Sequence, residues 1–225
     1  MTATLVEYLQ VLLNGLVMTL GLTASSLFAG TLIALICTLI LNTSCKSAKL
    51  GISGYLTLFT GTPLLVQLFL IYYGPGQFEW IKTTPLWPLL VEPWFCAVLA
   101  LSLNCGAYTT LLFNGAVKSV NKGQWEGCYS LGMSHTQTLK VLMPYALKRA
   151  YPAYSNEVIL LLKGSSLAST ITIMDIMGWS QRLNAQTYDT LMVFSAAGIL
   201  YLSLNMFITV MMRLMESRIL KFERL

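Results

Sequence analysis

Two charged side chains interrupt an otherwise apolar stretch in the second half of the chain. Glu157 and Lys163 lie within PAYSNEVILLLKGSSLAS, residues 152–169. Inside a bilayer a carboxylate costs about 2.5–3.5 kcal/mol on insertion scales, so we expect Glu157 to face protein or water. A carboxylate matches an ammonium group or, through a bidentate contact, a guanidinium group. These residue types predict a site for a cationic ligand, with a structural pairing of Glu157 to Lys163 as the alternative.

Helical spacing would place small residues on the same face as Glu157. Gly164 and Ala168 follow at +7 and +11, and such residues allow close approach of a neighbouring helix. Lys163 lies about 120° away on an ideal helix. It could therefore contact a ligand carboxylate, reach the membrane surface or pair structurally.

Other polar residues interrupt apolar stretches as well. Gln67, Asn104 and Tyr108 are candidates to line the same pathway. Gly61-Thr62-Pro63 predicts a helix break, because proline removes a backbone donor and frees a carbonyl that protein or water must satisfy. Broken helices often line transport routes, and a simple kink is the alternative.

The composition places these residues in a membrane. Only 10% of the 225 residues are charged and 56% are hydrophobic, whereas soluble proteins carry about 25% charged residues. Residues 8–45, 50–78, 93–117 and 190–212 contain no Asp, Glu, Lys or Arg. Each run exceeds the roughly 20 residues that cross the hydrocarbon core, and none alternates in polarity as barrel strands do.

We therefore predict an all-α, multi-pass integral membrane protein with about five transmembrane helices. The expected spans lie near 11–41, 52–73, 89–116, 152–174 and 191–213. Most of the fourteen basic residues fall in the 42–51 and 117–151 loops and the tail, which predicts an outside N-terminus and a cytoplasmic C-terminus. The net charge of +5 then reflects cytoplasmic loops rather than nucleic-acid binding.

A polar, glycine-spaced segment, residues 123–144, lies in the longest predicted cytoplasmic loop. Residues 123–133 predict a short helix that Gly132 ends, and residues 136–143 a second one that ends at Pro144. The pattern favours a docking surface, with a plain connector as the alternative. His135, the only histidine, is expected at the surface, so no metal site is predicted, and the five cysteines lack CxxC spacing.

Motifs for nucleotide binding and catalysis are absent from the sequence. There is no GxxxxGK[ST] phosphate loop, no HExxH and no Ser/His/Asp constellation. We therefore expect a non-catalytic chain without a bound cofactor. If transport is driven by ATP, a partner must hydrolyse it.

The 123–144 segment resembles the EAA loop of ABC importer permeases. The resemblance rests on Glu126, Gly132 and Pro144, with Gly127 and Cys128 in place of two alanines. It extends to FTGTPLLVQLFLIYYG, LNCGAYTTLLFNGAVKS and the 152–169 stretch, which are similar to polar amino acid permeases and best match the M-type permeases of bacterial arginine importers. Thr60 and Leu111 depart from that pattern, where the family has Arg and Glu.

The resemblance implies a type I ABC importer permease fold for the whole chain. Residues 12–215 would form the transmembrane domain, with a coupling loop at about 118–149 and a cytoplasmic tail at 216–225. Coupling contacts would come from the loop residues, which are Gly123, Glu126, Gly127, Cys128, Gly132 and Pro144. Glu157 would hold the side chain of a basic amino acid.

The same resemblance implies the partners and the location. These are ABC ATPase subunits that use ATP, a second permease subunit in a heterodimer, a substrate-binding protein and the bilayer of the bacterial inner membrane. The sequence leaves open a permease for histidine, lysine or glutamine. An ion-coupled secondary transporter and a membrane-embedded enzyme are further alternatives, although no inverted repeat and no catalytic grouping is visible.

Overall fold

A computed structural model describes residues 2–42 and 46–220 of the chain. The described residues form helices and connecting turns, and none of them lies in a strand. In chain order the elements are α1 (Thr2–Leu13), α2 (Leu16–Leu41), α3 (Lys46–Gly61), α4 (Leu64–Tyr73), η1 (Pro75–Gln77), α5 (Glu79–Lys82), α6 (Trp87–Leu90), α7 (Pro93–Lys118), α8 (Lys122–Ser130), α9 (His135–Ser165), η2 (Ser166–Ile171), α10 (Ile176–Thr187) and α11 (Thr190–Ile219).

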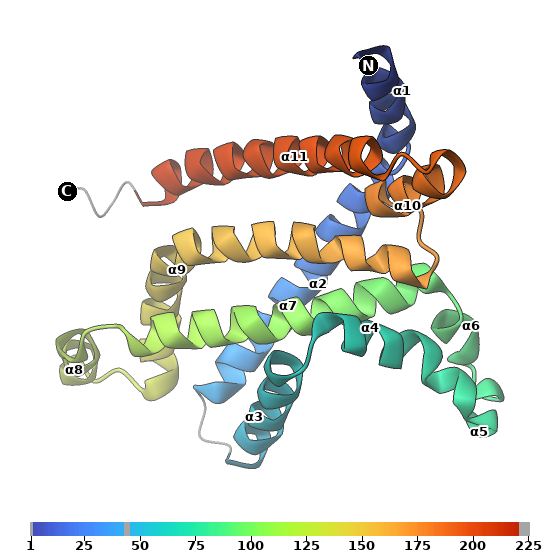
Figure 1. Ribbon diagram of the computed structural model, residues 1–225. Helices are drawn as coiled ribbons and strands as arrows, with labels where there is room; N and C mark the ends of the chain where they lie inside the picture. Colours follow the sequence, from blue (N-terminus) through green and yellow to red (C-terminus); the bar gives the residue numbers. More distant parts are fainter. Residues whose placement is uncertain (1, 43–45, 221–225) are drawn as a thin grey trace.

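Helix α7 lies at the centre of the bundle. It packs against α2, α3, α4 and α9, while α11 packs on the far side of α9 (Figure 1). The short helix α8 connects α7 to α9 at one end of the bundle, and α5 and α6 lie before α7 at the other end. The connection that contains α8 and the connection that contains α5 and α6 therefore lie at opposite ends of the molecule.

The contact between α2 and α7 is made by small residues. The buried face of α2 carries Thr19, Thr23, Ser26, Gly30, Ala34 and Thr38 at intervals of three or four residues. A Cβ on Gly30 would lie 3.1 Å from the Ser102 carbonyl oxygen, and one on Gly106 would lie 3.2 Å from the Gly30 carbonyl oxygen. Such spacing lets two helix backbones approach closely, as in other membrane helix pairs.

Three helices among the described residues are long and apolar enough to cross a membrane, namely α2, α7 and α11. Two bent pairs raise the number to as many as five if each pair is one span. The first pair joins α3 to the α4 segment with a bend of 107°, and the second joins α9 to α10 with a bend of 49°. The all-helical class is confirmed, and the predicted five spans are the upper end of this range.

One predicted helix end is wrong, and several predicted connections contain helices. The first span is preceded by a separate helix, α1, and the predicted 74–88 and 175–190 loops contain short helices. The helix that was expected to end at Pro144 instead runs on to Ser165. In the predicted tail, residues 216–219 continue α11. Residues 221–225 of that tail lie outside the described residues, and so does Cys45.

Proline does not end α9, because its neighbours hold the helix in place. Met143 and Ala146 are buried in an apolar cluster with Val117 and Leu142. Pro144 itself is exposed, as is Lys140, whose carbonyl loses its intrahelical partner and can bond to water. The helix changes direction along its length in Figure 1, as expected where proline lies inside a helix.

The turn between α1 and α2 packs against the start of α10. A Cβ on Gly15 would lie 2.4 Å from the Asp175 carbonyl carbon and from the Ile176 nitrogen. The Ile176 N–H donates to Thr19 Oγ1 at 3.1 Å, and the Tyr201 hydroxyl donates to the buried Asp175 carboxylate at 3.2 Å. These bonds join α2, α10 and α11 at one point.

We expect Gly15→Ala to destabilise the protein, because the added methyl group would overlap backbone atoms that cannot move independently. Forcing such an atom into a packed site costs about 1–3 kcal/mol. The free energy of unfolding in mixed detergent micelles measures the effect. Gly115→Ala is the matched control, since a Cβ there meets nothing within 4 Å; equal stability of the two variants would contradict this packing.

Candidate functional site

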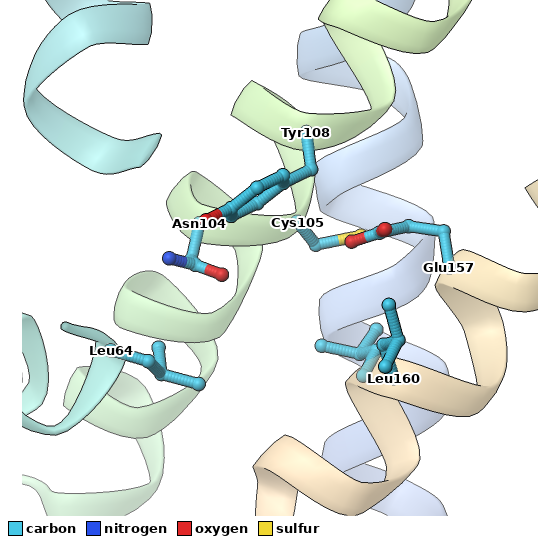
Figure 2. A pocket seen from close by; sticks show the side chains of 7 residues that line it. Leu64, Asn104, Cys105, Tyr108, Glu157 and Leu160 are labelled. Atoms are coloured by element: carbon cyan, nitrogen blue, oxygen red, sulfur yellow. The ribbon is translucent and has the colours of Figure 1, made fainter. Parts of the chain in front are cut away.

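A small pocket lies between α4, α7 and α9, and Glu157 is its charged residue. Its volume is about 100 Å³, and its lining consists of Leu64, Asn104, Cys105, Tyr108, Glu157, Leu160 and Leu161. Figure 2 shows the Glu157 side chain reaching from α9 toward Cys105 on α7. The structure therefore brings three of the predicted ligand residues, Glu157, Asn104 and Tyr108, to one place.

Glu157 is half-buried and has no cationic partner among the described residues. The ion pair that the described residues do form joins Lys82 to Glu79 within α5, away from the pocket. Lys163 is exposed, so the alternative pairing of Glu157 with Lys163 is not formed within the described chain. A half-buried carboxylate without a partner is what a site for a guanidinium or ammonium group requires.

Small residues bring the end of α9 and the following η2 close to their neighbours, although Ala168 lies in η2 and not on the helix of Glu157 as predicted. A Cβ on Gly164 would lie 3.1 Å from Leu64 Cδ2 on α4. Ala168 is buried in a cluster with Leu22 and Leu68. These contacts hold the end of α9 against α4, and η2 against α2 and α4. The side chain of Glu157 points from α9 toward α7.

The break between α3 and α4 forms one wall beside the pocket. Helix α3 ends at Gly61, and Pro63 adopts an extended conformation with φ −64° and ψ 137° before α4 begins. Gln67 Nε2 donates to the Phe59 carbonyl at 2.9 Å, to the Thr62 carbonyl at 3.0 Å and to Thr62 Oγ1 at 2.8 Å. The Gln67 side chain therefore satisfies the backbone carbonyls that the break leaves free.

Asn104 and Tyr108 connect the pocket to this break. Asn104 Nδ2 donates to Gln67 Oε1 at 3.0 Å and to the Phe59 carbonyl at 3.2 Å. The Tyr108 hydroxyl donates to the Thr60 carbonyl at 3.3 Å. Two residues that line the pocket thus hold the broken helix as well, whereas Gln67 is buried behind Asn104 and does not line the pocket.

Cys105 is a lining residue that the sequence analysis did not identify as part of a site. It is 1% exposed, and its thiol lies 3.7 Å from Thr109 Oγ1. Its place next to Asn104, one turn before Thr109 on α7, is the signal that could have identified it. Leu64, Leu160 and Leu161 supply the apolar part of the lining and carry no such signal.

The second candidate region is the exposed helix α8. Asn121 caps its start by accepting from the Gly123 N–H at 2.9 Å. Its end is a Schellman motif, in which Gly132 has φ 76°, the Gly132 N–H donates to the Tyr129 carbonyl and the Met133 N–H to the Cys128 carbonyl. The predicted short helix with its stop at Gly132 is confirmed.

One face of α8 is free in the described structure, and the other packs inward. Gly123, Glu126 and Gly127 are exposed, and a Cβ on Gly127 would meet nothing within 4 Å. Trp125 and Cys128 pack on the cluster that contains Val117 and Met143. Pro144, predicted as part of the same region, lies exposed inside α9.

The chain is similar to known transport proteins over almost its whole length. The family described as "binding-protein-dependent transport system inner membrane component" matches residues 30–221. The arginine ABC transporter permease protein ArtM of Haemophilus influenzae is 54% identical over 97% of this chain and 96% of its own length. ArtM of Escherichia coli K12 is 55% identical over 97% of this chain and 98% of its own length.

A solved structure is similar over almost the whole chain. The chain in the crystal structure of an amino acid ABC transporter with histidines has a TM-score of 0.85 and 31% identity. The match covers 96% of this chain and 97% of the other. The arrangement of helices described above is therefore one that an ABC transporter permease also adopts.

The hydrogen bonds of Gln67 predict its effect on stability. We expect Gln67→Leu to lower the free energy of unfolding by about 1–3 kcal/mol, because the Thr62 carbonyl and the Asn104 amide lose their partner. Unfolding in mixed micelles measures the difference. Gln77→Leu is the matched control on an exposed position, and a Gln67→Leu protein as stable as this control would show that the bonds do not hold the break.

Proposed function

Because the chain belongs to the family of binding-protein-dependent transport system inner membrane components, we propose that it is the permease subunit of an ATP-driven importer for arginine or a related basic amino acid. Its all-helical structure has the type I ABC permease fold. The observation that carries the choice of substrate is Glu157, a half-buried carboxylate without a cationic partner among the described residues.

In this proposal Glu157 binds the guanidinium or ammonium group of the substrate. The polar atoms of Asn104 and the ring of Tyr108 form the opposite wall, on α7. A guanidinium can donate two parallel hydrogen bonds to one carboxylate, which favours arginine over a neutral amino acid. Leu160, Leu161 and Leu64 would surround the aliphatic part of the side chain.

A second permease chain would complete the pathway. The pocket measures about 100 Å³, whereas ligand pockets usually span about 300–1,000 Å³. Beside it, the side chains of Tyr108, Leu111 and Leu160 are 41%, 46% and 52% exposed. These observations support a pathway between two chains, and the resemblance noted in the sequence favours a related but different permease as the partner.

ATP hydrolysis would occur on a separate ATPase subunit that docks on α8. The chain lacks a phosphate-binding loop, and α8 presents an exposed face with Glu126 and Gly127. We propose that this end of the bundle is cytoplasmic, because Lys118, Lys122 and Lys140 gather there, whereas the α5–α6 end carries Lys82. The chain would then lie in the bacterial inner membrane and receive substrate from a binding protein on the α5–α6 side.

Neutralising Glu157 tests the substrate role. A hydrogen bond to a charged group contributes about 1.5–3 kcal/mol, so we expect Glu157→Gln to lower arginine uptake at sub-saturating concentration by roughly ten- to a hundredfold. Uptake of labelled arginine into proteoliposomes with the complete complex measures this. Glu7→Gln, at an exposed position of α1, is the matched control; wild-type uptake by Glu157→Gln would remove Glu157 from the site.

A bulky residue on the open face of α8 tests the docking surface. We expect Gly127→Trp to fold, because nothing lies within 4 Å of its Cβ position, and to reduce ATPase binding. A steric mismatch that weakens affinity by about 1.4 kcal/mol lowers it tenfold, and co-purification with the ATPase measures the loss. Thr83→Trp, beyond α5 at the opposite end, should bind normally; undiminished binding by Gly127→Trp would contradict docking on this face.

A further inference from the structure

His135 occupies the junction between α8 and the transmembrane helices. It is the only histidine in the sequence and the first residue of α9. As expected from the sequence its side chain is exposed, but it is not a free surface residue. Its ring contacts α8 on one side and the end of α2 on the other.

Two contacts attach the ring to α8. The imidazole stacks on the indole of Trp125, with ring centroids 6.0 Å apart and an interplanar angle of 20°. The Tyr129 hydroxyl lies 3.0 Å from His135 Nδ1. Trp125 and Tyr129 are one helical turn apart, so both contacts involve the same face of α8.

A third contact attaches the ring to α2. His135 Nε2 lies 2.8 Å from the main-chain carbonyl oxygen of Asn42, the residue that caps the C-terminus of α2. A carbonyl can only accept, so Nε2 carries the proton and, in the neutral ring, Nδ1 accepts from the Tyr129 hydroxyl. The last carbonyls of a helix lack intrahelical donors, and a histidine side chain is one of the groups that can satisfy them.

Asn42 extends this connection to α7. Its side-chain Nδ2 donates to the Thr38 carbonyl at 2.8 Å and to Asn114 Oδ1 at 3.3 Å. A series of hydrogen bonds therefore runs from Tyr129 on α8, through His135 and Asn42, to Asn114 on α7. A capping box between Ser134 and Gln137 fixes the start of α9, where His135 is the first residue.

Helix α2 leads from this junction to the pocket of Glu157. Leu27 packs against Leu161 and Cys105, both of which line the pocket. One turn further along α2, Thr31 Oγ1 lies 2.6 Å from the hydroxyl of Tyr154, three residues before Glu157 on α9. A displacement of α2 along its axis would therefore move groups on both sides of the pocket.

We propose that His135 is a positioning residue that transmits the movement of α8 to α2 and, through α2, to the substrate pocket. The proposal rests on the proposed function, in which an ATPase subunit moves α8. The apolar cluster around Trp125 and Cys128 attaches α8 to α7 and α9, whereas His135 adds the hydrogen-bonded connection to α2. Without the ring, α8 would be connected to α2 only indirectly, through its packing on α7 and α9.

The test compares transport with ATP hydrolysis in the complete complex reconstituted into proteoliposomes. We expect the His135→Ala complex to assemble and to hydrolyse ATP at close to the wild-type rate. The amount of arginine that it imports per ATP hydrolysed should fall by about fivefold or more. His135→Gln keeps one donor and one acceptor and should recover part of the loss. Thr136→Ala, an exposed neighbour on α9, should keep the wild-type ratio.

Hydrogen exchange gives a readout that does not depend on transport. On ATP binding to the complex, we expect exchange in residues 36–42 to change in the wild type and to stay constant in His135→Ala. The proposal would be overturned if His135→Ala kept both the wild-type ratio of arginine imported to ATP hydrolysed and the wild-type change in hydrogen exchange on ATP binding. A parallel loss of assembly, import and hydrolysis that His135→Gln fails to recover would also overturn it. A wild-type complex that imports no arginine would instead contradict the proposed function, while the exchange response still decides the role of His135.

Discussion

A break in a membrane helix leaves carbonyls that lipid cannot satisfy, and the site of this protein is built around one such break. Gln67 donates to the carbonyls of Phe59 and Thr62, and Asn104 holds Gln67 from α7. Tyr108 makes a further bond to the Thr60 carbonyl. Because Asn104 and Tyr108 also line the pocket of Glu157, the groups that stabilise the break and the groups that line the pocket are partly the same. Movement of the broken helix and occupancy of the pocket are therefore expected to affect each other.

The features that follow from composition and local chemistry could be predicted from the sequence. Long uncharged runs indicate the membrane class, Gly61-Thr62-Pro63 indicates the break, and Gly132 indicates the end of α8. The pocket was partly predictable, because polar residues inside apolar runs must face protein or water, and Glu157, Asn104 and Tyr108 do meet there. The hydrogen bonds of Gln67 could not be predicted, because its partners are backbone carbonyls that become available only where the helix bends. Pro144 was misread because buried neighbours, which the local sequence does not reveal, carry α9 past it.

In the proposed function, the pocket binds the substrate and α8 contacts the ATPase subunit. Glu157 lies in a pocket between α4, α7 and α9, whereas α8 presents glycines and a carboxylate on an exposed face at one end of the bundle. What joins them is a set of close contacts along α2, from the Asn42 carbonyl to Leu27 and Thr31. Small residues on the buried face of α2 let it lie against α7 along most of its length. A rigid helix packed in this way can carry a displacement between two distant sites, provided that both ends are attached.

In the proposed function, this chain forms one part of a pathway that a separate ATPase drives. The most direct test measures the accumulation of labelled arginine in proteoliposomes that contain the chain alone, or the chain with its second permease, ATPase subunits and binding protein. We expect arginine to accumulate only in the complete complex and only with ATP on the side of the ATPase. Its accumulation should not depend on ion gradients. Accumulation by the chain alone, driven by a proton or sodium gradient, would contradict the proposed function.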